Sequence, residues 1–310
     1  MENTRAKTTR NSLILLLTAT IWGMAFVSQS KGMDYMHPFT FNGVRSLIGA
    51  AGILIYILLS RKIAGDKAAK LDWKLNVKAG LLCGIFLTIA STLQQFGIKY
   101  TSVGKAGFIT TLYIIFVPMF GIFLKKKVAP VVWAAAGMAA VGMYLLCMTE
   151  SLRLGAGDVM VFLCAIAFAI QIMTVDHYTA SIDGAVVSCI QFTACGVVCC
   201  IGALIWGQPT FGQIQEGLGA LLYAGVLSCG VGYTLQIVGQ KGLNPTVAAL
   251  IMSLESVIAT ISGWIAYKIG FLSTDQTLTP RQIAGCVIVF AAVILVQLPP
   301  EWFRFGKKNA

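Results

Sequence analysis

Long apolar runs alternate with short polar breaks along almost the whole chain. A helix needs about 20 apolar residues to cross the hydrocarbon core of a bilayer. The runs lack the alternation of apolar and polar positions that a membrane strand shows, and backbone in lipid must satisfy its own hydrogen bonds. The pattern therefore predicts an all-α polytopic membrane protein with ten transmembrane helices, at about 11–30, 38–60, 77–98, 104–124, 128–148, 157–175, 185–206, 217–238, 244–269 and 279–298.

The composition agrees with this prediction. Of the 310 residues, 57% are hydrophobic and 11% are charged, whereas soluble proteins carry about 25% charged residues. The mean hydropathy is +0.80. Too few polar side chains remain to cover a water-facing surface, which excludes a soluble enzyme, a disordered protein and a secreted disulfide-rich domain. The first apolar run continues from Leu13 past Trp22 without a signal-peptide cleavage site, so we expect an uncleaved helix.

The net charge of +11 comes mostly from short basic segments between the apolar runs. Examples are Arg61-Lys62 and Lys125-Lys126-Lys127. Basic loops mark the cytoplasmic side of a polytopic protein, so we expect both termini in the cytoplasm and no nucleic-acid partner. The loop after the sixth run contains His177 and Asp183 but no lysine or arginine, and it is the weak point of this orientation.

Motifs of enzymes and metal sites are missing from the sequence. All nine cysteines fall within apolar runs and show no metal-ligand spacing, so neither a disulfide nor a metal site is predicted. The sequence also lacks zinc-protease, phosphate-loop and nucleophile-elbow motifs. We therefore expect no catalytic residues, no cofactor, no enzymatic activity and no transport driven by ATP within this chain.

An internal repeat is the next signal. Leu93-Gln94 and Gly97-x-Lys99 recur 142 residues later as Leu235-Gln236 and Gly239-x-Lys241. The first two runs of each half match more weakly, with Trp22 and Arg45 aligned on Phe168 and Gln191. The chain therefore divides into two halves, 1–150 and 151–310, with five spans each. Because five is odd, the second half must enter the membrane from the opposite side, as in many secondary transporters.

Several motifs together resemble one family. They are Trp22-Gly23-x-x-Phe26, Arg45, the segment Thr101–Thr110 and Ser253-Leu254-Glu255-Ser256. The chain is similar in these motifs, and over essentially its whole length, to the EamA-type members of the drug/metabolite transporter superfamily. The resemblance implies an inverted five-helix repeat, a central cavity lined by spans 1–4 and 6–9, and export or exchange of small metabolites across the bacterial inner (plasma) membrane.

One motif departs from the family pattern. Members often carry a Gly-Glu pair after the fourth span, where this chain has Lys125-Lys126-Lys127. A role for that acidic position is therefore in doubt here.

Two charges inside apolar runs are the sharpest functional candidates, because each costs about 2.5–3.5 kcal/mol at a helix centre. Glu255 lies near the middle of the ninth run. It could couple transport to protons, bind a cationic substrate group, or hold helices together as a neutral or paired carboxyl. Arg45 shares a helical face with Asn42 and Gly49. It could bind a substrate carboxylate, pair with Glu255, or extend to the headgroups.

The remaining candidates are polar or aromatic side chains expected around a central cavity. The repeat register aligns Tyr113 with Glu255, so we expect these two side chains to face each other. Lys105 opens the fourth span, where it would extend to the headgroups or attract anions. For each amide, a helix–helix hydrogen bond is as good an interpretation as substrate contact. The other candidates are Trp22, Gln95, Gln171 and Gln236.

These observations predict a secondary transporter of small metabolites, amino-acid-like or drug-like, that works by alternating access. Protons are one candidate for the coupling ion, which the sequence does not identify, and spans 5 and 10 are expected to face lipid or a homodimer partner. A first alternative is a flippase of lipids or lipid-linked compounds, which would need a lateral opening. A membrane-embedded enzyme would need a cluster of acidic, histidine or serine residues at one depth, which the sequence does not show. A third alternative is a sensor or assembly protein that transports nothing, but such a protein would not need polar side chains around a central cavity.

Overall fold

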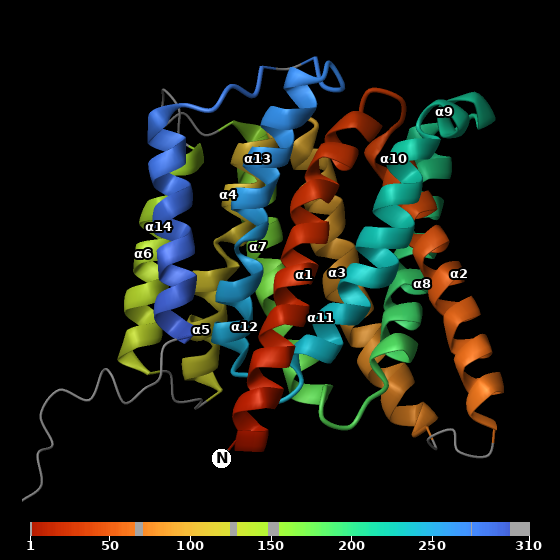
Figure 1. The fold of residues 1–310 in the computed structure, drawn as a ribbon. Helices are drawn as coiled ribbons and strands as arrows, with labels where there is room; N and C mark the ends of the chain where they lie inside the picture. Colours follow the sequence, from red (N-terminus) through yellow and green to blue (C-terminus); the bar gives the residue numbers. More distant parts are fainter. Residues whose placement is uncertain (1, 66–70, 125–128, 148–154, 274, 298–310) are drawn as a thin grey trace, which may run out of the picture.

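The computed structural model describes residues 2–65, 71–124, 129–147, 155–273 and 275–297. The described residues form a bundle of long helices that run roughly parallel or antiparallel to one another (Figure 1). The helices are α1 (Glu2–Gly32), α2 (Pro38–Ala64), α3 (Trp73–Ile98), α4 (Val103–Thr111), α5 (Tyr113–Phe123), α6 (Pro130–Cys147), α7 (Ala156–Tyr178), α8 (Gly184–Gly202), η2 (Ala203–Gly207), α9 (Phe211–Glu216), α10 (Leu218–Leu222), η3 (Tyr223–Gly232), α11 (Tyr233–Gln240), α12 (Pro245–Met252), α13 (Glu255–Lys268) and α14 (Pro280–Gln297).

Eight apolar helical stretches in the described part of the chain are long enough to cross a bilayer, and two shorter apolar helices accompany them. The shorter two are the described parts of α6 and α14, Pro130–Gly142 and Pro280–Leu295. Four passes are built from consecutive helices: α4 with α5, α8 with η2, α10 with η3 and α11, and α12 with α13. The prediction of an all-α polytopic membrane protein is confirmed. The basic segment Lys125-Lys126-Lys127 lies outside the described residues.

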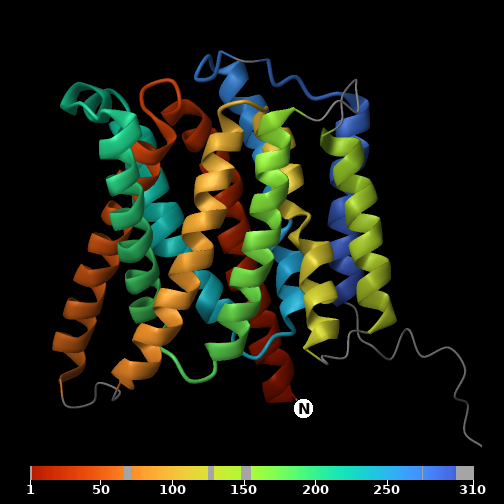
Figure 2. The ribbon, with the colours of Figure 1, turned by 180° about the vertical axis from the view of Figure 1, so that it is seen from behind.

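The two halves of the bundle have opposite directions. Helix α1 begins at one end of the bundle, which we call the N-terminal side, and ends at the other, which we call the far side (Figure 1). Its repeat counterpart α7 begins on the far side and ends on the N-terminal side, as the reverse view also shows (Figure 2). Helix α14 ends on the N-terminal side as well. The inverted arrangement expected from two five-span halves is therefore confirmed.

Helices α6 and α14 pack against each other at one edge of the bundle (Figures 1 and 2). Their outward faces carry exposed apolar side chains, including Val141, Val287 and Phe290. The polar residues of the bundle are buried among the other eight passes instead, on α1, α2, α3, α7, α8 and the composite helices. Spans 5 and 10 thus lie at the edge of the bundle, and the other passes surround its centre.

Candidate functional site

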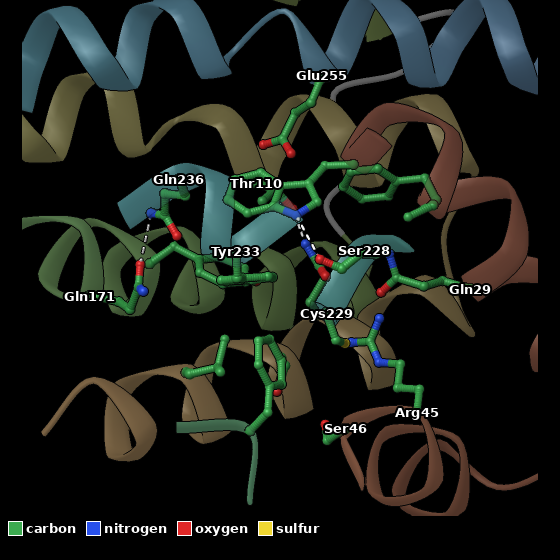
Figure 3. A pocket seen from close by; sticks show the side chains of 18 of the residues that line it. Gln29, Arg45, Ser46, Thr110, Gln171, Ser228, Cys229, Tyr233, Gln236 and Glu255 are labelled. Carbon is green, nitrogen blue, oxygen red and sulfur yellow. Dashed lines mark hydrogen bonds between the residues drawn. The ribbon is translucent and has the colours of Figure 1, made fainter. Parts of the chain in front are cut away.

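A cavity lies at the centre of the bundle and receives side chains from spans 1–4 and 6–9 (Figure 3). This is the set of spans that the family resemblance implied. The free volume of the cavity is about 40 Å³, which has room for about three water molecules. The structure therefore shows a closed conformation, in which a molecule much larger than water fits only after the helices move apart. The lining residues are Trp22, Ala25, Phe26, Gln29, Arg45, Ser46, Leu87, Ser91, Gln94, Thr110, Tyr113, Phe168, Gln171, Ile172, Phe192, Ser228, Cys229, Tyr233, Gln236 and Glu255.

Two interrupted helices bring Tyr113 and Glu255 together in this cavity. A turn at Leu112 separates α4 from α5, and a turn at Ser253-Leu254 separates α12 from α13. Tyr113 and Glu255 are the first residues of the helices that follow. The Tyr113 hydroxyl donates to Glu255 Oε1 at 3.0 Å, across 142 positions of sequence. The expectation that the repeat register places them face to face is confirmed.

Glu255 is a buried carboxyl without a positively charged partner. Its side chain is 4% exposed. Among the described residues, no lysine or arginine nitrogen lies within 4.0 Å of its oxygens, so the Tyr113 hydroxyl is the polar contact that the carboxyl makes. Because a buried carboxylate without a counter-charge is costly, this group gains from a proton or from a bound cation.

Arg45 lies at the opposite end of the cavity from Glu255 (Figure 3). Its Nε donates to Asn42 Oδ1 at 2.9 Å, and Asn42 Nδ2 in turn donates to the Ser91 carbonyl at 2.8 Å. The guanidinium carbon lies 5.4 Å from the centre of the Phe41 ring. No carboxylate of the described residues lies within 4.0 Å of it, so the structure does not show the ion pair with Glu255 that the sequence left open.

Amide side chains supply further hydrogen-bonding groups. Gln236 Nε2 donates to Gln171 Oε1 at 3.2 Å (Figure 3), and Gln94 Nε2 donates to Thr110 Oγ1 at the same distance. Gln171 Nε2, Gln236 Oε1 and Gln29 Oε1 are buried without a hydrogen-bond partner in the structure. Buried polar atoms are normally satisfied, so these donors and acceptors are suited to a ligand or to bound water.

Aromatic rings form one wall of the cavity. The Trp22 and Tyr233 ring centres lie 4.5 Å apart, and Phe192 meets Tyr233 edge-on at 4.9 Å. Trp22 Nε1 donates to the Ser228 carbonyl at 3.4 Å, which satisfies its polar atom. The wall gives the cavity an apolar surface beside its polar groups.

Two of the predicted site residues lie away from the cavity lining. Gln95 is fully buried and donates from Nε2 to the Gln29 carbonyl at 3.2 Å. Its neighbour Gln94, which we did not single out, lines the cavity instead. The repeat register carried the missing signal, because it aligns Gln94, and not Gln95, with Gln236.

The other residue is Lys105, which helps close the far side of the bundle. Its Nζ lies 2.6 Å from Asp158 Oδ2 on α7. Thr101 Oγ1 donates to Asp158 Oδ1 at 2.8 Å, and the Gly155 backbone N–H donates to Asp158 Oδ2 at 2.9 Å. The ion pair joins the fourth span to the sixth, and thereby the first half of the chain to the second.

Repeat-related glycines let helices of the two halves cross closely at both ends of the bundle. A Cβ atom at Gly97 of α3 would collide with Val161 of α7. Gly239 of α11 occupies the equivalent position on the N-terminal side, where a Cβ atom would collide with Leu15 of α1. Asn11 Nδ2 adds a hydrogen bond to the Lys241 carbonyl at 2.8 Å on that side. Both ends of the cavity are thus closed by contacts between the halves.

Comparison with known families agrees with this geometry. The model of the EamA-like transporter family matches residues 10–148 and again residues 155–298. The chain belongs to the EamA-like transporter family. It is therefore a multi-pass membrane transporter, and the resemblance noted from its sequence motifs is confirmed.

Relatives and a solved structure extend over nearly the whole chain. A protein of Archaeoglobus fulgidus named "Uncharacterized transporter" is 28% identical over 290 residues, covering 92% of this chain and 84% of its own length. "Uncharacterized transporter YwfM" of Bacillus subtilis is 24% identical over 295 residues, covering 94% of each chain. A protein crystal structure that is 16% identical aligns with a TM-score of 0.73 over 96% of this chain and 99% of its own, which supports the fold.

Proposed function

We propose that this EamA-like transporter is a secondary transporter that moves small metabolites, amino-acid-like or drug-like, across the plasma membrane by alternating access. The observation that carries the proposal is one central cavity lined by an arginine and a glutamate that are not paired with each other. Unpaired charges inside a membrane protein are costly, and they mark substrate or ion pathways. Arg45 and Glu255 are therefore the groups most suited to bind the substrate or to couple its movement to an ion.

The cavity suits a small molecule that carries both charges. Arg45 has guanidinium donors left over beside its bond to Asn42, and such donors bind a carboxylate in a bidentate manner. Glu255 at the other end can accept an ammonium group. The free amide atoms of Gln171 and Gln236 and the ring of Trp22 would contact the remainder of the molecule.

The inverted halves, 1–150 and 151–310, supply the mechanism. Rocking of one half against the other around a fixed site opens the cavity to the two sides of the membrane in turn. Opening toward the far side separates Lys105 from Asp158, and opening toward the N-terminal side separates Asn11 from the Lys241 carbonyl. The excess of lysine and arginine on the N-terminal side supports the proposal that this side faces the cytoplasm.

Glu255 is the proposed site of coupling. A proton on Glu255 would neutralise the carboxyl, so that the empty transporter can reorient without carrying a buried charge. Alternatively, Glu255 binds the substrate cation itself. In the first case a pH gradient drives accumulation, and in the second case the transporter exchanges one substrate for another.

The test is a substrate screen with purified protein in liposomes, with and without an imposed pH gradient. We expect uptake of zwitterionic amino acids or similar amphipathic metabolites, and loss of this uptake in the Arg45→Gln variant. Movement of fluorescent phospholipid between leaflets, without uptake of any water-soluble compound, would instead identify a flippase and refute the proposal.

A further inference from the structure

Two apolar grooves outside the central cavity are open to the bilayer-facing surface of the bundle. One lies between α3, α5 and α7 and has a free volume of about 450 Å³. The other lies between α1, η3 and α13 and has a free volume of about 430 Å³. We call them the N-side groove and the far-side groove, because their lining residues fall near the ends of α5 and α7 and near the ends of α1 and α13, respectively. Helices α5 and α7 end on the N-terminal side, and α1 and α13 end on the far side (Figure 1).

The repeat register relates the two grooves to each other. Tyr113 at the start of α5 and Glu255 at the start of α13 are 142 residues apart. The same spacing aligns residues of the N-side groove on or next to α5 with residues of the far-side groove on α13. Three residues of the N-side groove fall on three residues of the far-side groove: Phe120 on Ser262, Phe123 on Ile265 and Leu124 on Ala266.

The first spans of the two halves repeat this agreement. Trp22 aligns with Phe168, and continuing in that register joins three more pairs of lining residues. The pairs are Met24 with Ile170, Val27 with Met173 and Ser28 with Thr174. The grooves are therefore one structural feature that the inverted duplication has placed in both halves of the membrane.

Each groove also lies on a seam between the halves of the chain. Helix α5 of the first half packs on α7 of the second half at the N-side groove. Helix α13 of the second half packs on α1 of the first half at the far-side groove. Rocking of the halves changes the width of these seams. A molecule bound in a seam would therefore bind more tightly to one conformation of the transporter than to the other.

The lining selects an apolar, chain-like occupant. Nearly all lining side chains are aliphatic or aromatic, and Thr174 Oγ1 is satisfied by the Ile170 carbonyl at 2.8 Å. Exposed side chains such as Phe123 and Ile265 continue the apolar surface toward lipid. The mouths are polar: the N-side groove reaches His177 and Tyr178, and Lys31 Nζ lies 5.9 Å from the Phe271 ring of the far-side groove.

We propose that each groove binds an acyl chain of a phospholipid from its own leaflet. The polar or basic groups at the mouth then lie at the depth of the lipid headgroup, where such side chains are favoured. The two sites make bilayer lipid a structural part of the seams between the halves. This proposal does not depend on the identity of the transported compound.

The test uses phospholipids with a photoreactive diazirine in the acyl chain, added to the reconstituted full-length protein. We expect labelling of Met173 and Ile265 to exceed labelling of Leu58, which is 61% exposed on the outer face of α2. Thr174→Trp should abolish labelling in the N-side groove alone, and Ser28→Trp in the far-side groove alone. The matched control Leu58→Trp should change neither.

Two results would overturn the proposal. One is equal labelling of the grooves and of the α2 face, which would mean ordinary lipid contact. The other is loss of groove labelling when a transported water-soluble compound is added, which would assign the grooves to the substrate. Labelling is measured without transport, so an inactive transporter with labelled grooves leaves this proposal standing.

Discussion

At the scale of single residues, the cavity separates two opposite charges that could have neutralised each other. Arg45 is held by Asn42 and the Phe41 ring, and Glu255 is held by the Tyr113 hydroxyl. These contacts orient both side chains toward the cavity and leave part of their binding capacity unused. An ion pair would have been a structural contact, whereas this arrangement keeps both charges available to a ligand.

The substitution Glu255→Gln distinguishes a role of Glu255 in proton coupling from a purely structural role. A glutamine can still accept the Tyr113 hydrogen bond at 3.0 Å, so we expect membrane insertion and thermal stability close to those of the parent. Because an amide takes up no proton, accumulation driven by a pH gradient should be abolished in proteoliposomes. The matched control Glu216→Gln, which changes an exposed carboxyl on α9, should transport normally. Gradient-driven accumulation that persists in Glu255→Gln would remove this residue from the mechanism.

The sequence predicted these residues to different degrees. Glu255 and Arg45 were visible because charges in apolar runs are costly, and the repeat register predicted the contact of Tyr113 with Glu255. Gln95 was expected to line the cavity, whereas its neighbour Gln94 lines it. Adjacent residues of a helix point about 100° apart, and in a helix surrounded by others both directions are buried, so spacing could not tell which amide lines the cavity.

At the scale of helices, the closing contacts at the two ends of the bundle differ in kind. The far side uses the Lys105–Asp158 ion pair, which Thr101 and Gly155 support. The N-terminal side uses neutral hydrogen bonds, from Asn11 to the Lys241 carbonyl and from the Asp183 backbone N–H to Asn76 Oδ1. Charge-assisted hydrogen bonds are about twice as strong as neutral ones, so the ion pair is the strongest single one of these closing contacts.

Asp158→Asn should therefore favour opening toward the far side. Asparagine keeps the bond from Thr101 but loses the ion pair with Lys105 and the bond that the Gly155 backbone N–H donates to Oδ2. Loss of the ion pair weakens the closure by about 1.5–3 kcal/mol. A water-soluble thiol reagent added on the far side should then reach the cavity residue Cys229 faster than in the parent. The variant Lys105→Gln should behave alike, and the double variant should add little. Unchanged or slower modification in both single variants would contradict this role of the ion pair.

The start of α2 makes a pH-dependent contact outside the spans. His37 precedes the helix, and its Nδ1 accepts a hydrogen bond from the Phe39 backbone N–H at 3.4 Å. Burial, with a smaller effect of Lys99, lowers the pKa of His37 from its ordinary value of 6.5. The neutral form is therefore favoured in the folded protein, and its stabilisation is complete above pH 6.5 and lost as the pH falls below it.

We expect the melting temperature of the detergent-solubilised parent to fall between about pH 7 and pH 5 more than that of His37→Asn. Asparagine is a good residue before a helix and does not titrate in this range. Differential scanning fluorimetry of both proteins across this range measures the difference. Parallel pH profiles of the two proteins would show that His37 does not contribute.

The sequence predicted the number and positions of the membrane spans, but it did not predict where the helices are interrupted. Each predicted run coincides with a described pass, because the length of an apolar run is fixed by the thickness of the bilayer. The interruptions at Leu112 and at Ser253-Leu254, and the π-helical segment Tyr223–Gly232, gave no signal in an apolar pattern. Such irregular turns depend on packing against neighbouring helices, which a single sequence does not contain.

At the scale of the whole molecule, one duplication accounts for the main features. It produced the opposite directions of the halves, the paired breaks that bring Tyr113 to Glu255, and the paired crossings at Gly97 and Gly239. The odd number of spans in each half was enough to predict the inversion. The closed state of the cavity was not predictable, because it depends on which set of end contacts is formed.

In the proposed mechanism, the cavity opens to each side of the membrane in turn. The direct measurement uses a variant that keeps Cys229 as its single cysteine, in oriented proteoliposomes, with a membrane-impermeant thiol reagent applied to one side at a time. Cys229 lines the cavity and is 2% exposed in the closed structure. As a control, a cysteine placed at the bilayer-facing Leu58 should not react. We expect slow modification of Cys229 from either side, and protection by a transported compound. Modification from one side alone, or from neither side, would contradict this mechanism.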